Sequence, residues 1–487
     1  MIRAALTLLT ASALTACSMA PKYERPVAPV PPSWPIGDAY LRASEAALPI
    51  ISYRDIFRDV RLQRIIETAL VNNRDLRIAA GNIAAARAQY RIQRAGRFPT
   101  LAGTGDATIR SGTVVNPTGA TATSTTTDNY QLGLGVSAFE IDLFGRVASL
   151  TRAEQNEYFA TEAAARATRL TLVGDIANAW VTYASDRSLM RIAEDTVRSA
   201  GQSVRLTNLR LRGGVAPRTD LRQAELVLAQ AQSDLAEQRT ALAQDTNFLR
   251  LLVGADVDPT LLPESIEAVA PTLAELPAGL DSTVLLRRPD VVQAEYTLQA
   301  ANARIGAARA ALFPRISLTG LLGLTSGALG GLFSGDAFNY SARGSAAYNI
   351  FDGGAARGNV ALSQAQRDIA LATYERTIQT AFREVSDALA RRGTIGEQER
   401  AQTSLVASAQ DNYNLSDARY RGGIDTFLQS LDAQRSLYSS QRSLVATRLV
   451  RAQNLVALYR TIGGDALLEA TPDGPRPLSV EPAAAPR

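Results

Sequence analysis

The sequence predicts an internally duplicated α+β membrane protein in which pairs of β-strands alternate with long helical hairpins. Three observations lead to this prediction. Short motifs of the first half recur in the second at a nearly constant offset, which is typical of a tandem duplication. Each half has stretches in which apolar and polar residues alternate, as in strands with one apolar face. Each half also has a proline-free run of about 63–66 residues, far longer than the usual globular helix.

The composition excludes several kinds of chemistry. The chain has 487 residues with a formal net charge of +4, no histidine and one cysteine, Cys17. It therefore forms no internal disulfide and no cluster of cysteine and histidine ligands for a metal, and most nucleophilic triads are ruled out. The arginines are spread among Asp and Glu without a basic block, so nucleic acid is not an expected partner.

Residues 1–16 are predicted to be a lipoprotein signal peptide. A short apolar run, Ala4 to Leu14, is followed by "LTAC", which resembles a bacterial lipobox ending at Cys17. An ordinary signal peptide or a short membrane anchor is the alternative, although the run is too short to span a bilayer. Cys17 is therefore the expected lipidation site, and apart from this covalent lipid no cofactor or metal is expected. In lipoproteins, Ser18 at the next position favours sorting to the outer membrane.

Residues 17–60 are predicted to hold the lipid anchor, a Pro-rich tether and an N-terminal segment. The stretch "APKYERPVAPVPPSWP" contains six prolines. Such a composition favours an extended polyproline conformation over packing.

Two copies of one unit are predicted, at residues 61–255 and 282–465, with a linker at 256–281 and a disordered, Pro-rich tail at 466–487. The offset between matching motifs is 215 at the first pair and 209 at the Gly pairs, so the first copy carries a few extra residues. The matching motifs are Phe98-Pro99 with Phe313-Pro314, Phe144-Gly145 with Phe351-Asp352-Gly353, and Gly213-Gly214 with Gly422-Gly423.

Each copy is expected to begin with a helix, at 62–96 and at 282–311, that ends at the Phe-Pro motif. The reason is that the residue before a proline is disfavoured in the helical region. A β-hairpin then follows, at 98–145 and 313–352, and next comes a helix of about 95 Å, at 149–211 and 355–420.

The strands show the alternation most clearly where they return towards the helices. Tyr130, Leu132 and Leu134 alternate with polar or small residues, and so do Phe338 and Tyr340. Both a soluble hairpin with one wet face and a membrane hairpin with apolar residues facing lipid fit this pattern. In lipid, four strands would leave open edges, so a membrane barrel requires several chains, and three chains would supply twelve strands.

The Gly pairs are expected at the tips of two helical hairpins, near residues 213 and 422. Glycine ends a helix by adopting a left-handed cap, after which the chain returns by a shorter helix. The second return helix is expected to begin with a capping box of Thr426 and Gln429. Heptads on the return helices predict coiled-coil packing. Their members are Leu221, Leu228, Leu235, Leu242 and Leu249 on one helix and Ile424, Leu431, Tyr438 and Val445 on the other.

Lipobox, tether, strand pairs and coiled-coil hairpins in this order resemble the TolC-like outer membrane factor family. "CSMAPKYERP" and "YRGGIDTFLQSLDAQRSLY" resemble its lipoprotein branch, which serves efflux systems of the resistance-nodulation-division type. The resemblance implies a homotrimeric 12-stranded β-barrel in the outer membrane, continued into the periplasm by a long α-helical coiled-coil tunnel. It implies a passive exit duct for drugs or other small toxic compounds, a periplasmic adaptor and an inner-membrane pump as partners, and no catalysis.

The resemblance also implies site residues. An adaptor is expected to dock at the hairpin tips, although the glycines are also explained by capping alone. A periplasmic gate is expected around Tyr420 and Asp432, which match family gate residues. Arg421 is the nearest candidate partner for the carboxylates, and Asp425 stands where the family has an arginine, so it is also explained as a helix-start residue. The tip residues are Gly213, Gly214, Val215, Gly422, Gly423 and Ile424.

Other functions remain as alternatives. The helices alone would also fit a coiled-coil structural or envelope-spanning protein without transport. A similar duct could serve type I secretion or metal efflux. An enzyme is the least supported reading, because the glycine-rich "GGLFSGD" at 330–336 lacks the lysine of a phosphate-binding loop.

Overall fold

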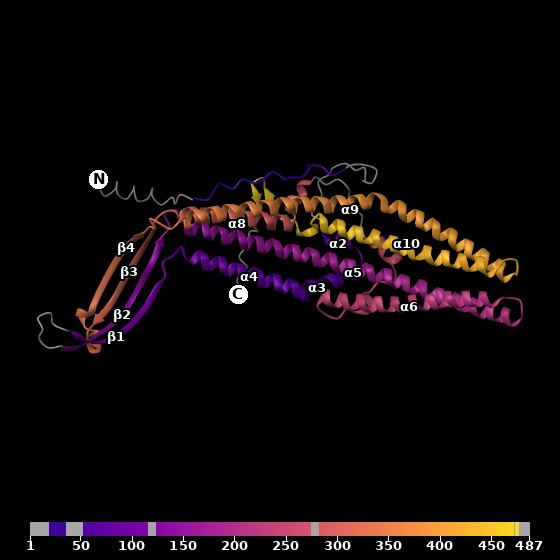
Figure 1. Ribbon diagram of the computed structural model, residues 1–487, viewed down its shortest axis with the longest axis horizontal. Coiled ribbons are helices and arrows are strands. Elements are labelled where there is room, and N and C mark those ends of the chain that lie inside the picture. Colours follow the sequence, from indigo (N-terminus) through magenta and orange to yellow (C-terminus); the bar gives the residue numbers. More distant parts are fainter. Residues whose placement is uncertain (1–18, 36–51, 115–122, 274–281, 472, 477–487) are drawn as a thin grey trace. The chain divides into compact units, whose positions relative to one another are not determined.

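The computed structural model describes residues 19–35, 52–114, 123–273, 282–471 and 473–476 (Figure 1). Cys17 and the predicted signal peptide lie outside the described residues. The chain forms two compact units, which are described separately. The strand unit comprises Met1–Arg25, Ile83–Ala160 and Ala294–Thr373, and the hairpin unit comprises Pro26–Asn82, Thr161–Gln293 and Tyr374–Arg487. Among the described residues, no helix combines the length and the apolar character needed to cross a bilayer.

The strand unit is built on one antiparallel sheet with the strand order β1-β2-β3-β4 (Figure 1). Its strands are β1 (Leu101–Val114), β2 (Thr123–Ile141), β3 (Arg315–Ser326) and β4 (Phe338–Ala347). The strands of the two copies therefore form one sheet, joined where β2 pairs with β3. Large apolar side chains remain exposed on it, among them Leu134 and its cross-strand partner Leu322, each 57% exposed.

A bulge interrupts the pairing of β2 with β3. The register shifts between Val136 and Phe139, and Ala138 adopts a φ of 51°. The backbone N–H of Ala138 donates to the Thr319 hydroxyl over 3.1 Å, so the unpaired amide is satisfied. The alternation of apolar and polar residues changes phase at such a site, because a bulge places two residues opposite one.

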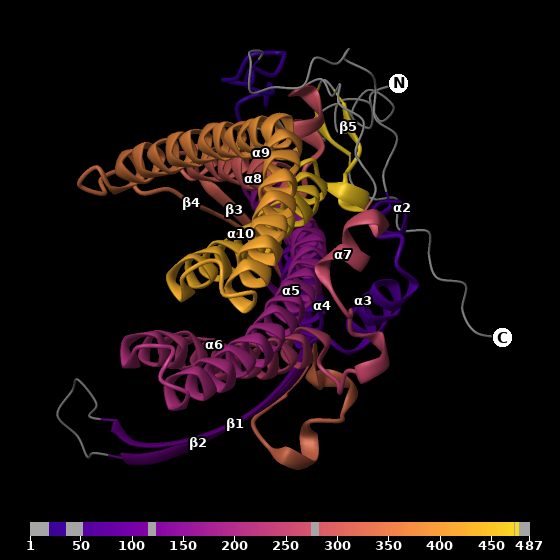
Figure 2. The same ribbon diagram turned by 90° about the vertical axis from the view of Figure 1, so that its right-hand side faces the viewer.

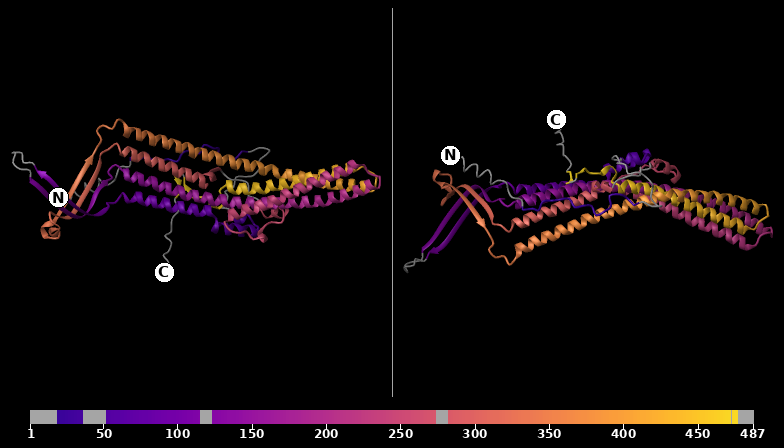
Figure 3. Two further views of the ribbon diagram at one scale, coloured as in Figure 1. Left: turned by 60° about the horizontal axis from the view of Figure 1, so that its bottom comes forward. Right: turned by 90° about the horizontal axis from the view of Figure 1, so that it is seen from above.

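Four helices run from the strand ends. These are α4 (Arg74–Ala95), α5 (Arg146–Arg212), α8 (Pro289–Ala310) and α9 (Ala355–Arg421), and within the strand unit they lie side by side (Figure 3). The two long helices start in the same way, because an aspartate accepts from a backbone N–H of the first turns. Asp142 accepts from Ala148 over 2.7 Å, and Asp352 accepts from Ala356 over 2.8 Å.

The predicted tether is packed, which corrects the expectation of a free extended segment. Residues 19–25, which we call the strap, have no regular secondary structure but lie along α8. The Arg25 guanidinium and the Tyr23 hydroxyl both bind Glu295, over 2.6 and 3.0 Å, and the Glu295 side chain is fully buried. Proline favours an extended backbone, but it does not prevent the neighbouring side chains from binding a helix.

Two further contacts fix the strap at seven-residue intervals along α8. Asn302 donates to the Pro21 carbonyl over 2.8 Å, and Arg309 donates to the Met19 carbonyl over 3.4 Å. Between them the strap backbone approaches α8 so closely that a Cβ added at Gly306 would lie 2.7 Å from Ala20. Because glycine has no Cβ, it leaves room for the strap backbone at this position.

The hairpin unit contains two antiparallel helix pairs, α5 with α6 (Arg218–Val253) and α9 with α10 (Phe427–Thr461) (Figure 2). Helices α5 and α9 have 67 residues each, which corresponds to about 100 Å. The predicted heptad seam holds for Leu235, Leu249, Leu431 and Val445, which are buried. Ile424 is an exception, since it precedes α10 and is 69% exposed.

The hairpin unit also contains several short elements. They are α2 (Tyr53–Ile56), α3 (Val60–Asn72), η1 (Pro259–Leu261), α7 (Ile266–Val269), η2 (Ala270–Thr272) and η3 (Ser282–Arg287). The predicted linker is thus partly helical, and its Leu273 bridges to Phe57. Its carbonyl at Leu261 accepts from the indole of Trp180, a fully buried side chain of α5, over 3.0 Å.

Three boundaries differ from the sequence prediction. The helix expected at 62–96 breaks at Asn73. The backbone N–H of Asn73 donates to the Ala69 carbonyl at the end of α3, and its side-chain oxygen accepts from the Leu76 N–H at the start of α4 over 3.0 Å. The helix expected from 282 begins at Pro289, because residues 282–287 form η3. The tail expected to be disordered from 466 contains β5 (Ala470–Thr471) and β6 (Gly474–Pro475), and Leu468 is buried.

Candidate functional site

The two Gly pairs close both hairpins with the same turn. In the first, Val215 N–H donates to the Arg210 carbonyl and Gly214 N–H to the Leu211 carbonyl; in the second, Ile424 and Gly423 do the same to Arg419 and Tyr420, all over 2.9–3.0 Å. This pattern is the Schellman motif. Its left-handed residues are Gly214 and Gly423, at φ values of 74° and 72°. The turns thus explain both glycine pairs by geometry.

The residues after the glycines are large, apolar and exposed. Val215 is 76% and Ile424 is 69% exposed. No atom of the described residues lies within 4 Å of a Cβ added at Gly214 or Gly423, so the turns are open on the outside. Two apolar side chains on two matched turns are available to a partner, as expected for docking tips.

A small apolar core lies directly behind the turns. It contains Tyr420 of α9, Phe427 and Leu431 of α10, and Ala224 of α6, and Val204, Leu206 and Val227 pack against it. The rings of Tyr420 and Phe427 are tilted with centroids 5.3 Å apart. The core joins all four helix ends, so the two tips are packed as one body within the hairpin unit.

Arg210 binds the two hairpins together across this core. Its guanidinium lies 4.3 Å from the centroid of the Tyr420 ring. It also donates to the carbonyls of Tyr420 over 3.0 Å and of Arg421 over 3.2 Å, at the C-terminal end of α9. A cation there satisfies terminal carbonyls and complements the helix dipole.

Tyr420 contributes its ring and backbone to this contact, whereas its hydroxyl contributes nothing. The side chain is buried, at 4% exposure, and its hydroxyl has no hydrogen-bond partner among the described residues. Within the described part of the chain, Tyr420 therefore joins the hairpins through its ring and its carbonyl.

The charged residues expected at the gate are paired differently from the prediction. Asp425 binds Arg419, which holds the pKa of that carboxyl below its usual value. Arg421 pairs with Asp417 over 2.8 Å, so Arg421 is not the partner of Asp425. Asp432 is exposed and has no hydrogen bond or ion pair within the described part of the chain. Within the described part of one chain, Arg419 and not Arg421 is therefore the partner of Asp425.

The capping box expected at the start of α10 is also absent. Thr426 has the extended backbone of an N-cap residue, but its side chain makes no capping hydrogen bond. The Asp425–Arg419 pair and the Schellman turn fix the chain at this point instead.

A second set of links joins the hairpins farther from the tips. The Tyr438 hydroxyl donates to the buried Asp234 carboxylate over 2.5 Å, and Arg442 lies 3.4 Å from the same oxygen. Gln434 donates to the Ser199 hydroxyl over 3.0 Å. Burial, together with Asp234, raises the pKa of Tyr438. The tyrosine therefore remains a hydrogen-bond donor at physiological pH.

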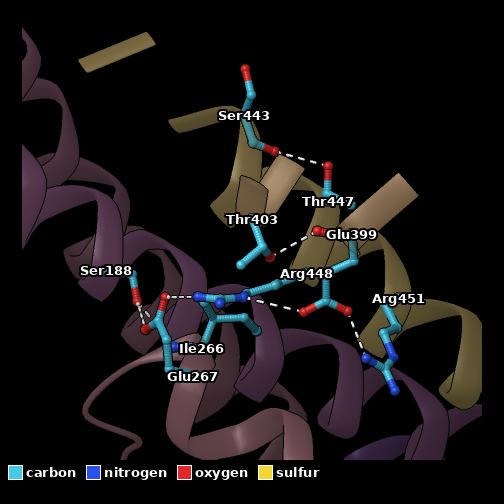
Figure 4. Close-up of polar contacts among 9 residues, drawn as sticks. All are labelled: Ser188, Ile266, Glu267, Glu399, Thr403, Ser443, Thr447, Arg448 and Arg451. Atoms are coloured by element: carbon cyan, nitrogen blue, oxygen red, sulfur yellow. Dashed lines mark hydrogen bonds and ion pairs between the residues drawn. The ribbon is translucent and has the colours of Figure 1, made fainter. Parts of the chain in front are cut away.

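Farther still, an ionic network connects four helices (Figure 4). Arg448 of α10 lies between Glu267 of α7, at 2.7 Å, and Glu399 of α9, at 3.3 Å, and Arg451 binds the second oxygen of Glu399 over 2.6 Å. The Ser188 hydroxyl of α5 donates to Glu267 over 3.0 Å. Glu399 is 22 residues from the end of α9, which is about 33 Å along the helix. The network thus fixes the hairpins well away from the tips.

Arg210 and Asp234 were missed in the sequence, although one signal for Arg210 was present. Arg210 and Arg419 are equivalent in the two copies, and the residue equivalent to Asp425 is Ala216. Arg210 therefore lacks the local carboxylate that binds Arg419, and it reaches the neighbouring hairpin instead. No comparable signal marks Asp234.

A four-stranded sheet with an exposed apolar surface and two coiled-coil hairpins with matched tips define an outer-membrane channel subunit. Solved structures share this fold. A membrane protein from Pseudomonas aeruginosa aligns with a TM-score of 0.85 at 39% identity, covering 92% of this chain and 100% of that one. The open state of the Neisseria gonorrhoeae MtrE outer membrane channel aligns with a TM-score of 0.81 at 32% identity, covering 93% and 99%. The predicted fold class, strands of a membrane β-barrel continued by a helical tunnel, is confirmed.

The chain belongs to the outer membrane efflux protein family, whose sequence model matches residues 65–255 and 280–464. Among similar proteins, the probable efflux pump outer membrane protein TtgC of Pseudomonas putida is 44% identical over 458 residues, covering 94% of both chains. The outer membrane protein OprJ of Pseudomonas aeruginosa is 41% identical over 461 residues, covering 94% of this chain and 95% of its own. The predicted family, outer-membrane location and role in efflux are therefore confirmed.

Proposed function

We propose that three copies of the chain form a passive exit duct for drugs or other small toxic compounds. Each chain supplies four strands, so three chains supply the twelve of a closed barrel, and the hairpins continue the duct into the periplasm. Relatives at 44% identity are named as toluene and antibiotic efflux pump outer membrane proteins, which supports small toxic compounds as the cargo.

The observation that carries the proposal is the exposed apolar surface of a sheet with two unpaired edges. Leu132, Leu134, Leu318 and Leu322 are 44–57% exposed, although large apolar side chains are usually buried. Among the described residues, no further strand pairs with the outer edges of β1 and β4. Lipid would cover the apolar side chains and neighbouring subunits would pair the strand edges, whereas water would solvate the edges but leave the apolar surface exposed.

The proposed partners are a periplasmic adaptor at the hairpin tips and, through it, an inner-membrane pump of the resistance-nodulation-division type. Val215 and Ile424 support this role, since they place matched apolar contacts on both hairpins. Residues Gly213, Gly214, Gly422 and Gly423 shape the turns that present them. The gate is proposed at the same end, with Asp432 available to the lumen and Arg210 holding Tyr420 against the first hairpin.

Lipidation of Cys17 is also proposed, and the position of the strap supports it. Arg309 holds the Met19 carbonyl near the end of α8, six residues before β3 begins at Arg315. Cys17 lies two positions before Met19, and two residues span at most about 7 Å. A lipid on Cys17 would thus enter the bilayer at the level where the strands start.

The proposal is tested by efflux in cells that lack their own duct. Cells that express the chain together with its pump and adaptor should export a fluorescent substrate. Val215→Asp and Ile424→Asp should abolish export at unchanged trimer abundance, because a charge desolvated in an apolar contact weakens docking. Val215→Ile and Ile424→Val are the matched controls and should export normally. Normal export by the Asp variants would show that the tips do not dock the adaptor.

A further inference from the structure

The duplication provides an internal pattern for the contact between subunits. Where the first copy meets the second, Phe144 stacks on Phe313, with ring centroids 4.6 Å apart and an angle of 16° between the rings. Each ring lies three residues beyond the paired residues Ile141 of β2 and Ile316 of β3. The stack therefore closes the junction at the end of the β2–β3 ladder.

The other two equivalent phenylalanines stack on no aromatic ring in the part of the chain that the structure describes. Phe98 corresponds to Phe313, and Phe351 corresponds to Phe144. Phe98 is 63% exposed and Phe351 is 90% exposed. They flank β1 and β4, the two edge strands of the sheet (Figure 1). The chain thus carries two halves of a second junction, one on each edge.

We propose that β4 of one subunit pairs with β1 of the partner subunit, with the strand ends aligned as at the end of the β2–β3 junction but without the bulge of that pair, and with Phe351 stacked on Phe98 of the partner subunit. This inference rests on the proposed trimeric duct and specifies its interface. The register follows from the internal junction, because Tyr348 and Leu101 each lie three residues from their phenylalanine. Tyr348 therefore lies opposite Leu101 of the partner subunit.

Charges on the strands support this register independently. Counted from this end along strands without a bulge, as in the β1–β2 and β3–β4 pairs, the register places Arg343, five residues farther along, opposite Asp106 of the partner subunit. Both side chains are exposed, and neither has an ion pair within the described part of the chain. Opposite charges on directly facing residues stabilise an antiparallel pair, and like charges destabilise it.

Alternative registers lose this agreement. A shift by one residue would place Arg343 opposite an apolar-face residue of β1, because side chains alternate between the two faces. A shift by two residues keeps the faces matched but puts Arg343 opposite Thr104 or Thr108. A shift by four residues in one direction puts it opposite Arg110. Of these registers, only the one that aligns Tyr348 with Leu101 and continues without a bulge pairs the charges; a copy of the β2–β3 bulge in β4 would place Arg343 opposite Gly105.

A cavity at the same junction supports the position of the aromatic stack. It has a volume of about 330 Å³ and lies beside β4 and the start of α9. Its lining includes Tyr348, Ile350 and Phe351, which are 58%, 93% and 90% exposed. The phenyl ring of Phe98 from the partner subunit would cover these side chains, as Phe313 covers Phe144 within the chain.

The register is tested by disulfide crosslinking in outer membranes. Asp106→Cys with Arg343→Cys should give dimers and covalent trimers on non-reducing gels, because facing residues have Cα atoms about 4.5–5.5 Å apart. Asp106→Cys with Ser341→Cys or with Ser345→Cys are the matched controls. They shift the pair by two residues, about 7 Å along the strand, and should crosslink at least tenfold less. Equal or stronger crosslinking by a control would overturn the register.

A charge exchange provides a second test that does not depend on oxidation. Asp106→Arg places two arginines opposite each other and should lower the temperature at which the trimer dissociates on gels. Adding Arg343→Asp should restore that temperature towards the wild-type value. A double variant whose trimer dissociates at the same temperature as that of Asp106→Arg, or at a lower one, would overturn the proposal.

Efflux by the wild-type protein distinguishes a failure of the proposed register from a failure of the proposed duct. If the wild type exports and migrates as a trimer while neither test gives the expected result, only the register is wrong. If the wild type forms no trimer and exports nothing, the duct itself is refuted, and this interface with it.

Discussion

Replacing Arg210 with alanine should open the periplasmic end of the duct. The guanidinium stacks on the buried Tyr420 ring at 4.3 Å and donates to two carbonyls at the end of α9, over 3.0 and 3.2 Å. A cation–π contact contributes about 1–2 kcal/mol, and a shared hydrogen bond from a charged donor about 1.5 kcal/mol. When the half-buried guanidinium separates from Tyr420 and the end of α9, water restores part of these interactions. The net free energy lost is therefore about 2 kcal/mol.

About 2 kcal/mol corresponds to roughly a 30-fold change in an equilibrium constant. If separation of the hairpins opens the duct, Arg210→Ala should raise the ratio of open to closed time about 30-fold in planar bilayer recordings. Arg210→Lys should give a ratio between those of the wild type and Arg210→Ala, because lysine retains the charge but lacks the flat stacking surface.

Arg212→Ala is the matched control. This arginine lies two residues farther along α5, is exposed, and has no ion pair within the described part of the chain. It should conduct like the wild type. A wild-type open fraction in an Arg210→Ala trimer of normal abundance would refute the reasoning and place the closing contact elsewhere.

Three further predictions concern the anchor, the lumen and the first hairpin. Cys17→Ser should abolish incorporation of labelled fatty acid, since the sequence contains no other thiol; label in the variant would refute lipidation. Asp432→Ala, alone or with Asp425→Ala, should weaken cation selectivity in single-channel recordings, because carboxylates around a lumen attract cations; unchanged selectivity would place the constriction away from these residues. Burial and the neighbouring Asp186 raise the pKa of Asp245 to about 7. Its usual value is about 3.9, so the folded protein holds a proton that the unfolded chain releases, and stability is lost as pH rises from about 4 through 7. The melting temperature should therefore fall between pH 5 and pH 8, and Asp245→Asn should reduce that fall; a wild-type melting temperature independent of pH would contradict it.

Local signals in the sequence were sufficient for the main elements. The Phe-Pro motifs, the alternation in the strands and the Gly pairs each depend on the backbone preferences of a few adjacent residues. The turns at Gly214 and Gly423 are examples, since their left-handed conformation favours glycine whatever lies around it.

Contacts between distant residues were not predictable in this way. Arg25 and Glu295 are separated by 270 residues, and nothing near either residue indicates the pair. The break at Asn73 is similar, because its side chain also donates to the Leu252 carbonyl of α6 over 2.8 Å. At the tips, the sequence placed several charged residues within reach of one another, and only the three-dimensional arrangement selects Arg419 over Arg421 for Asp425.

The strap has a consequence for the order in which the protein folds. Its residues are synthesised early, but Glu295, Asn302 and Arg309 are added only after the whole first copy. Closing a loop of 270 residues is entropically unfavourable, and contacts of such separation form slowly. A chain interrupted before residue 295 therefore has no binding site for the strap. The strap is therefore among the last parts of the described chain to reach its final position.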